Sequence, residues 1–339
     1  MKNKRFKLFS DCIPVKGFSR SIIYDLTRKT YDFIPNGLFE ILEQGIIDVE
    51  DYYKTLEKSV HSIFEDYIQF LLEKEYIFEI YNDSEISDYP NLELEFDYPS
   101  KISNAVIDFD DSFDLLLESV SRLEMMNCNF LSIRILSEIS CGDLEKILDF
   151  FFESVIFSID IVVNYNSNLS IDFIKTLILK SSRINSIFVF GSPIDQYDNS
   201  LLSNGMGDIT YLKGTYQKDK ILKIKGEQDF IVNIKLFTES MNFNNFYNKK
   251  VYISERGDVK NSPFTEEVIG NIFKDLLDDL LNKDSFTNLW KVKKDNIVVC
   301  KDCEFRYMCV DNRIPKVKSD SEWFFEDECN YNPYLHSWK

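Results

Sequence analysis

Four of the seven cysteines of this chain lie within its last forty residues, and this cluster constrains the fold more than any other feature. The spacing is Cys300-x2-Cys303-x5-Cys309-x19-Cys329. Two thiolates separated by two residues can bind one metal centre from a tight turn, a third follows after a short loop, and the fourth returns from further along the chain. We therefore predict one metal site with these four cysteines as its ligands.

The thiolates alone do not decide which metal is bound, because four of them suit either tetrahedral zinc or an iron–sulfur cluster. Zinc ribbons usually pair two Cys-x2-Cys units, whereas here one such pair is followed by a cysteine after five residues. This spacing favours an iron–sulfur cluster over zinc, and unligated core cysteines are the third alternative. The remaining cysteines stand alone among apolar neighbours and are expected to be buried thiols without a role: Cys12, Cys128 and Cys141.

The net charge excludes two classes of partner. The chain has 57 acidic and 39 basic residues, a formal net charge of -18. Such a surface repels phosphate backbones and anionic lipid headgroups, so neither nucleic acid nor a membrane is an expected partner. The basic first residues precede no apolar stretch, and no run of eighteen apolar residues occurs, so we expect a cytoplasmic protein.

The hydrophobic pattern changes twice along the chain. Short β-prone runs over 6–34, with a hairpin at 21–34, are followed by helical periods, and three strands followed by three helices predict a winged-helix-like unit. The acidic stretch 82–90 is the expected linker. Residues 102–240 alternate β-branched runs with helix-length segments, which predicts βα units forming a parallel sheet, as an open or partial barrel.

After residue 240 the pattern predicts a hairpin over 250–259 with Gly257 at its turn. An amphipathic helix is expected next, from Ile269 to Leu281, because its apolar residues share one face. The expected fold class is therefore a multi-domain α/β protein.

The C-terminal region carries a resemblance to a known family. The run VVCKDCEFRYMCVDNR, the upstream ISERGDVKNSP and VIGNIFKDLL, and the closing ECNYNPY resemble the SPASM domain, the cluster-binding extension of peptide-modifying radical SAM enzymes. The resemblance implies that the four cysteines hold the second of the two auxiliary 4Fe-4S clusters of that domain. The ligands of the first are missing, since Arg313 stands where a further cysteine usually follows and 242–263 contains none. One 4Fe-4S cluster is expected, with zinc as the alternative.

The middle region resembles a radical SAM barrel that has lost its cofactor site. The Cys-x3-Cys-x2-Cys loop of that family is absent after the strand AVIDFD, and its Gly-Gly-Glu element is replaced by RILSEI, which keeps only Glu138. Leu136 and Ser137 do not allow the close backbone approach to a ligand that glycine allows. The resemblance implies that S-adenosylmethionine is not bound, that no residue is catalytic, and that Glu138 is a relic.

The sequence offers little other chemistry. It has no phosphate-binding glycine loop and no nucleophile elbow. His61 is expected on a helix surface, and His336 is expected to be solvated rather than to support the metal ligands. An acidic group near a strand end could hold magnesium, although a solvated loop is favoured in so acidic a chain: Asp108, Asp110, Asp111 and Asp114.

The first eighty residues resemble the PqqD-like recognition element of enzymes that modify ribosomally made peptides. In that family a leader peptide binds as an added strand beside the third strand, and the third helix closes the groove. The resemblance places the edge strand at Tyr31–Ile34. The peptide-binding residues it implies, each with a core role as the alternative, are Tyr31, Phe33, Phe64, Tyr67 and Ile68.

Together the resemblances divide the chain into a PqqD-like leader-recognition domain (1–83), a degenerate radical SAM-like partial barrel without the SAM cluster (84–240) and a SPASM domain with one four-cysteine site (241–339). This combination is similar to the SPASM-domain maturases of grasp-with-spasm (graspetide-type) peptide systems. It implies a maturation factor that binds the precursor leader and presents it to an ATP-grasp ligase. Two alternatives stay open: a redox or SAM-dependent iron–sulfur enzyme that modifies a peptide, and a zinc-stapled binding protein.

Overall fold

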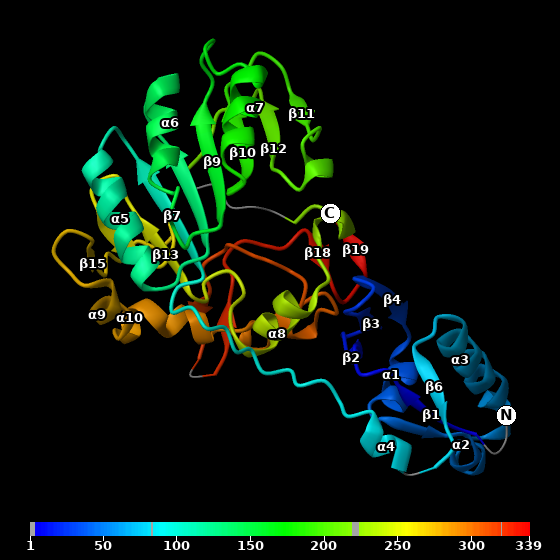
Figure 1. The fold of residues 1–339 in the computed structure, drawn as a ribbon. Coiled ribbons are helices and arrows are strands. Elements are labelled where there is room, and N and C mark those ends of the chain that lie inside the picture. The colour runs from blue at the N-terminus through cyan, green and yellow to red at the C-terminus, as the bar shows by residue number, and fades with distance from the viewer. Residues whose placement is uncertain (1–3, 83, 219–223, 320) are drawn as a thin grey trace.

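The computed structural model describes residues 4–82, 84–218, 224–319 and 321–339 (Figure 1). These residues form a mixed α/β fold built on a nine-stranded sheet, with two three-stranded sheets near the N-terminus and two short hairpins near the C-terminus. The predicted domain boundary at 83 lies outside the described residues. None of the described helices combines the length and the apolar composition needed to cross a lipid bilayer.

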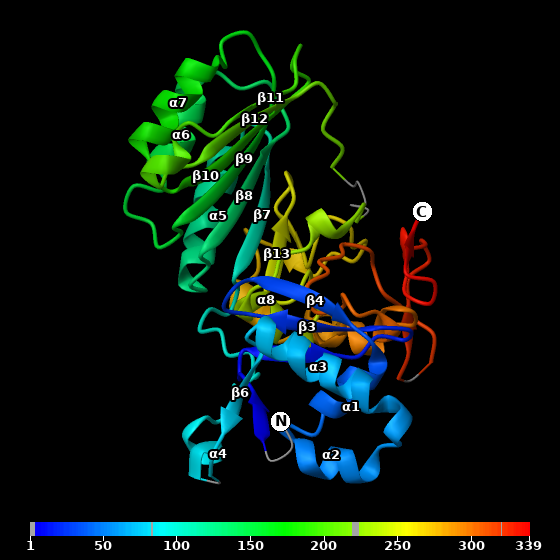
Figure 2. The same cartoon turned by 90° about the vertical axis from the view of Figure 1, so that its right-hand side faces the viewer.

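The N-terminal part contains two small antiparallel sheets, in the orders β5-β1-β6 and β2-β3-β4 (Figure 2). The hairpin predicted over 21–34 is confirmed, because β3 and β4 pair antiparallel with Tyr24 opposite Tyr31. The strand predicted at Phe6–Phe9 belongs to the other sheet, between two strands that the pattern did not predict. The strands are β1 (Arg5–Leu8), β2 (Cys12–Val15), β3 (Ser21–Asp25), β4 (Thr30–Ile34), β5 (Ile46–Asp48) and β6 (Ile77–Ile80).

Helices cover this part of the chain where the apolar spacing predicted them. In α3 the buried residues Phe64, Ile68 and Leu71 recur at intervals of four and three, so one face of the helix enters the core. The Asp48 carboxylate caps α2 by accepting from the main-chain N–H of Glu50. The helices are α1 (Asn36–Leu42), α2 (Val49–Thr55), η1 (Lys58–Val60) and α3 (His61–Glu73).

The stretch 82–90 packs more closely than its composition predicted. Helix α4 (Ser84–Asp88) occupies most of it. The Lys7 ammonium donates to the carbonyl oxygens of Ile86 and Tyr89, and the Tyr89 ring centroid lies 4.8 Å from that of Phe78. The main chain of a polar segment can thus still serve as an acceptor for a buried lysine.

The nine-stranded sheet has the order β11-β12-β10-β9-β8-β7-β13-β14-β15. Strands β7 to β10, β12 and β13 run parallel, which confirms the predicted βα units. The order is linear, so the described sheet is open. The strands of the region before residue 240 are β7 (Asn104–Phe109), β8 (Phe130–Ile135), β9 (Ser158–Asn164), β10 (Ile184–Phe190), β11 (Gln196–Asp198) and β12 (Asp208–Leu212).

Three helices cover one face of this sheet (Figure 2): α5 (Phe113–Met125), α6 (Cys141–Asp149) and α7 (Ile171–Lys180). Each is capped by a serine whose hydroxyl accepts from the main-chain N–H three residues further on, namely Ser112, Ser140 and Ser170. Their apolar faces and the buried faces of the strands form the largest hydrophobic core of the molecule. Short βα connections that end at a capping serine thus set where each helix starts.

The region after residue 240 extends the same sheet. Strand β13 pairs parallel with β7, and Gly257, at φ +80°, turns the chain into β14, as predicted. The C-terminal region therefore shares its core with the middle region. Its elements, together with those just before it, are η2 (Leu202–Asn204), η3 (Glu227–Asp229), α8 (Ile234–Asn242), β13 (Lys250–Ile253), β14 (Asp258–Lys260), β15 (Gly270–Asn271), α9 (Leu277–Leu281), α10 (Asp284–Thr287), η4 (Asn288–Lys291), η5 (Lys294–Asn296), η6 (Cys300–Asp302), β16 (Lys316–Val317), β17 (Trp323–Phe324), β18 (Tyr331–Asn332) and β19 (Ser337–Trp338).

The helix predicted from Ile269 to Leu281 is wrong. The segment starts as strand β15, and only its last five residues are helical. A side chain at Gly270 would meet Leu280 at 2.7 Å, and the main-chain N–H of Asn271 donates to the Asp275 carboxylate at 2.8 Å. The close packing and the turn at Gly270 and Asn271 therefore prevent a helix here, although the spacing of the apolar residues favours one. Ile269 still lies in the core.

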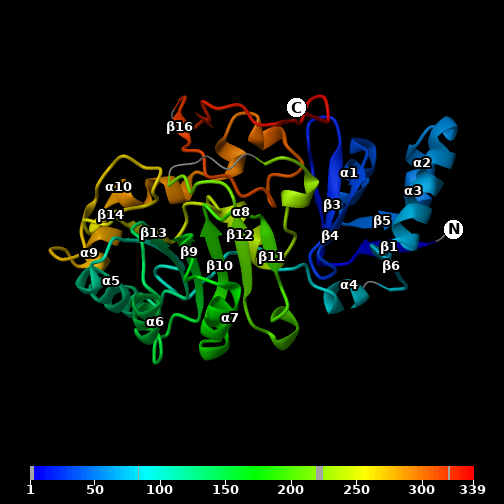
Figure 3. The ribbon, with the colours of Figure 1, turned by 90° about the horizontal axis from the view of Figure 1, so that it is seen from above.

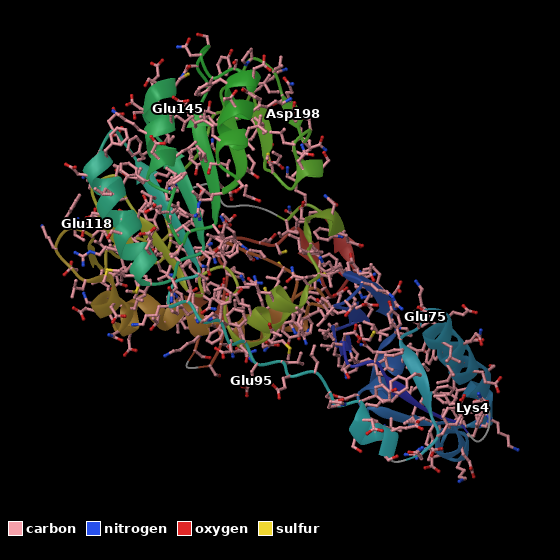
Figure 4. The ribbon with its side chains drawn as sticks, in the orientation of Figure 1. Lys4, Glu75, Glu95, Glu118, Glu145 and Asp198 are labelled. Carbon is pink, nitrogen blue, oxygen red and sulfur yellow. The ribbon has the colours of Figure 1, made fainter. Side chains whose placement is uncertain are left out.

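Acidic side chains are spread over the molecule. The labelled residues Glu75, Glu95, Glu118, Glu145 and Asp198 lie on separate parts of the chain (Figure 4). Several are paired, as Glu118 is with Arg122 and Glu145 with Lys180. The net charge of -18 is thus not confined to one element.

Candidate metal centre

The four predicted ligands lie in the part of the chain with the least regular structure. Cys300 begins helix η6, Cys303 follows it, Cys309 comes after a further turn, and Cys329 stands just before β18. All four are free thiols that are partly exposed. Turns rather than long elements therefore position the candidate ligands.

Main-chain hydrogen bonds hold the first of these turns. The N–H of Cys303 donates to the carbonyl of Cys300 at 3.1 Å, and the N–H of Arg306 donates to the carbonyl of Cys303 at 3.3 Å. Val299 adopts φ +71°, a conformation that a β-branched residue rarely adopts. Such strain persists only where the surroundings hold it, and it is often found at functional sites.

Neighbouring thiols contribute to the pKa shifts of Cys300, Cys303 and Cys309. Burial raises the pKa of Cys309 to about 12; Lys294 opposes this effect, while Cys300 and Cys329 add to it. Burial likewise raises the pKa of Cys300 to about 11, with Lys294 opposing and Cys329 adding. The pKa of Cys303 is raised by burial and, more weakly, by Cys300 and Cys309. The four cysteines therefore form one electrostatic group.

Within the described ranges, no three or more His, Cys, Asp or Glu side chains are placed to hold one metal ion. The metal site stays a prediction, and its fit is tested by the residues around the thiols.

A buried lysine beside the thiols supplies that test. The Lys294 side chain is 4% exposed, and its ammonium pairs with the Asp311 carboxylate at 3.3 Å without the geometry of a hydrogen bond to any described residue. Burial lowers its pKa, but Asp311, Cys309 and Cys300 raise it above the ordinary value. A buried cation is costly unless negative charge lies beside it. The Asp311 carboxylate supplies one such charge on one side of the ammonium, and thiolates around a metal would supply more beside Cys300 and Cys309, so the residues present fit a metal–thiolate centre.

Arg313, at the position of the missing further cysteine, has a structural role. Its Nε donates to the Asp311 carboxylate at 3.0 Å, and its guanidinium lies 4.1 Å from the centroid of the Phe325 ring. The pKa of Asp311 is lowered to about 2, because Lys294 and Arg313 outweigh its burial. An ion-pair network thus lies directly beyond Cys309.

The five predicted peptide-binding residues divide between two faces of the sheet β2-β3-β4. Phe64 and Ile68 are buried in the core of the N-terminal helices, with Tyr67 at its margin. Tyr31 and Phe33 instead pack against residues 300–331, here called the cysteine segment, in a second core. The five side chains therefore do not line one groove.

The predicted acidic group is divided as well. Asp108 is fully buried at the end of β7, where it accepts from Tyr252 at 2.7 Å and pairs with Lys218 at 2.6 Å. Asp110, Asp111 and Asp114 are exposed. The expectation of a solvated loop therefore holds for three of the four carboxylates and is wrong for Asp108.

The remaining candidates are unremarkable in their surroundings. Glu138 and His336 are exposed and His61 is partly exposed, with its Nε2 3.2 Å from the carbonyl oxygen of Leu56. Cys12 and Cys128 are buried, as predicted. Cys141 is partly exposed instead, because it lies at the first position of α6 rather than on its apolar face.

Sequence reasoning missed the charged residues that surround the thiols. Lys294 is the third lysine of the run KVKK, and no signal separates it from its neighbours. Glu304, between the second and third cysteines, is fully buried although the sequence gives it no partner. A charged residue inside a tight ligand loop is the one signal that could have drawn attention to Glu304.

No family model matches this chain, and no curated protein matches it.

Proposed function

We propose that this protein is a maturation factor for a ribosomally made peptide, which binds the leader of the precursor along strand β4 and presents it to a partner ATP-grasp ligase. The position of β4 carries this proposal. Among the described residues β4 pairs with β3 on one side only, so its other edge offers unpaired main-chain groups. An extended peptide can add to such an edge as a further strand.

The C-terminal end of helix α3 lies beside this edge. The Asp32 carboxylate of β4 accepts from the Lys74 ammonium at 3.0 Å and from the Tyr76 hydroxyl at 2.6 Å. In the proposal the main chain of β4 supplies affinity, and the side chains along α3 and β4 supply specificity. Of the three predicted residues on α3, only Tyr67 is partly exposed, so it is the one of these best placed to contact the peptide directly.

The other regions complete the proposal. The N-terminal part is a PqqD-like, winged-helix-like unit, the open βα sheet is a degenerate radical SAM-like partial barrel, and the cysteine region is a SPASM domain. Its four cysteines hold one 4Fe-4S cluster, with zinc as the alternative, and the metal is structural. The cysteine spacing and the buried Lys294 ammonium support this assignment.

The sheet is proposed to act as a scaffold without S-adenosylmethionine and without a catalytic residue. At the carboxyl ends of β7 and β8, the Arg134 guanidinium pairs with Asp108, and both side chains are buried. In open α/β sheets ligands bind at this edge, next to the strand ends. Here the chain's own ion pair lies there, which supports a structural role.

Titration of short peptides encoded beside the gene tests the proposal. Calorimetry with the full chain should find one peptide that binds. Analogues of that peptide, N-methylated at one residue at a time, serve as matched probes. Methylation at alternate residues should weaken binding by about tenfold or more, because each loses one main-chain hydrogen bond, while methylation in between should not. Failure of every such peptide to bind, or equal effects at all positions, would remove the proposal.

Metal analysis of anaerobically purified protein tests the centre. A cluster gives about four irons and four sulfides per chain, and the alternative gives about one zinc. Co-purification with the neighbouring ATP-grasp ligase, dependent on the peptide, tests the partner. Cleavage of S-adenosylmethionine by iron-loaded protein would contradict the scaffold role.

A further inference from the structure

The sheet that bears β4 and the cysteine segment share one hydrophobic core. One face of β2-β3-β4 contributes Val15, Ile22 and Tyr24. The cysteine segment contributes three residues from the loop between Cys303 and Cys309, here called the ligand loop, and one residue that follows Cys329. Figures 1 and 3 both show the C-terminal elements beside β3. The members from the cysteine segment are Phe305, Tyr307, Met308 and Tyr331.

Phe305 is the centre of this core. It is 1% exposed and stands between Cys303 and Cys309 in the sequence, so it moves with the ligand loop. Its ring centroid lies 5.7 Å from that of Phe33 and 6.2 Å from that of Tyr31. The side chains of the proposed peptide-binding strand thus rest on a residue whose position depends on two candidate ligands.

Glu304 makes a second connection. Its buried carboxylate accepts from Arg20 at 2.7 Å and from the Tyr331 hydroxyl at 2.6 Å, and its main-chain carbonyl accepts from the Tyr24 hydroxyl at 3.0 Å. The Arg20 guanidinium in turn lies 3.5 Å from the centroid of the Phe33 ring. The buried Glu304 carboxylate therefore holds the Arg20 guanidinium against the Phe33 ring of β4.

The main chains of the two parts also meet. The main-chain N–H of Phe18 donates to the carbonyl of Asp302 at 2.8 Å, and the side-chain guanidinium of Arg306 donates to the main-chain carbonyl of Lys16 at 2.6 Å. A side chain at Gly17 would meet the Arg20 carbonyl oxygen at 2.3 Å and the Glu304 Cβ at 3.0 Å, so glycine permits both the turn of this loop and its approach to Glu304. The loop between β2 and β3 is thus fitted to the backbone of the cysteine segment.

We propose that metal bound by the four cysteines fixes Glu304 and Phe305 in place, and that these residues hold strand β4 in the form that accepts the peptide. Loss of the metal then weakens peptide binding at a site that the metal does not touch. This regulation rests on the proposed function of β4. By linkage the coupling is reciprocal, so a bound peptide also tightens metal binding, and coupling of this kind commonly changes affinity by about 5- to 150-fold.

Hydrogen exchange of the full chain tests the inference with metal as the only probe. Protein purified anaerobically is compared with protein stripped by a chelator. We expect amides of β3 and β4 to exchange at least about fivefold faster after stripping. Strands β8 to β10 of the nine-stranded sheet belong to a separate core that contains no residue of β3 or β4, so they are the reference sheet and should not change.

Three outcomes would overturn the inference. Faster exchange confined to residues 300–331 means that the metal does not reach β4. Equal acceleration in the reference sheet means general unfolding rather than coupling. Protein that takes up no metal cannot couple metal binding to strand β4. Each of these results leaves the peptide titration unaffected, so the proposed function is tested separately.

The variant Phe305→Leu tests the route. It keeps an apolar side chain but removes the ring contacts with β4, so the effect of stripping on β4 should shrink by at least about half while metal content is retained. Phe286 is equally buried, but it lies in the core of the nine-stranded sheet. Phe286→Leu is therefore the matched control and should preserve the full effect. A response of β4 that is the same in both variants would place the coupling elsewhere.

Discussion

The Arg134 guanidinium donates from Nε to the Asp108 carboxylate at 2.5 Å, which joins the carboxyl ends of two neighbouring parallel strands. Tyr252, from the adjoining strand β13, donates to the same carboxylate. Asp108 is fully buried and Arg134 is 5% exposed. One carboxylate of β7 thus links the next strand, β8, with β13, which lies far away in the sequence.

Asp108→Asn should destabilise the protein by about 3–5 kcal/mol, because it leaves the buried Arg134 cation without its charge partner. The free energy of unfolding in urea measures the effect. Asp110→Asn, two residues further and exposed, is the matched control and should change stability by less than about 0.5 kcal/mol. Equal stability of both variants would show that the network contributes little.

Cys309→Ser should abolish metal binding, because a hydroxyl is a poor replacement for a thiolate ligand of zinc or iron. Metal analysis and the absorbance of a cluster measure the loss. Cys141→Ser changes a partly exposed cysteine in α6, far from the other four in the sequence, and should keep the full metal content. Equal metal content in the two variants would contradict the assignment of ligands.

Lys294→Met should lower the retention of metal under a chelator challenge by about tenfold or more, since it removes a buried ammonium that lies beside Cys300 and Cys309 as well as Asp311. Lys301→Met is the control in the same segment. Lys301 lies beside Cys300, but it is 42% exposed and pairs with Glu322 on the surface. A surface pair of this kind contributes little, so this variant should retain its metal. The same loss from both variants would point to general charge effects.

The sequence predicts those features whose signals are local. The βα units were predictable because each strand is a short β-branched run and each helix follows a capping serine, as at Ser112. The buried face of α3 follows from the spacing of Phe64, Ile68 and Leu71 for the same reason. The cysteine spacing likewise lies in a short segment.

Features that depend on distant segments were not predictable. Strand β13 pairs with β7, which lies about 145 residues earlier in the chain. The hydrophobic pattern of a strand shows which of its side chains are buried, but not which strand pairs with it. A period of two shows that Tyr31 and Phe33 share a face, but not that Phe305 covers it. At Gly270 a local signal misled, because close packing against Leu280 overrides the helical spacing of the apolar residues.

A lysine at the start of β13 should make stability depend on pH. Burial lowers the pKa of Lys250 to about 8, and Glu239 opposes the shift. Its ammonium lies 3.5 Å from the centroid of the Phe246 ring. Glu239, whose pKa is raised by burial, also faces Lys235 and Lys249. The folded chain therefore holds this lysine's proton less tightly than the unfolded chain does.

The sign follows from proton linkage. Between pH 8 and the ordinary value of 10.5, the unfolded chain binds more protons at Lys250, so this residue makes stability rise with pH there. Lys250→Met removes the titrating group. The stability of the wild type minus that of the variant should increase from pH 8 to pH 10, by at most about 1.4 kcal/mol per pH unit. Urea unfolding at several pH values measures this difference, with exposed Lys274→Met as control. A difference that falls with pH, or that matches the control, would show that Lys250 is not desolvated.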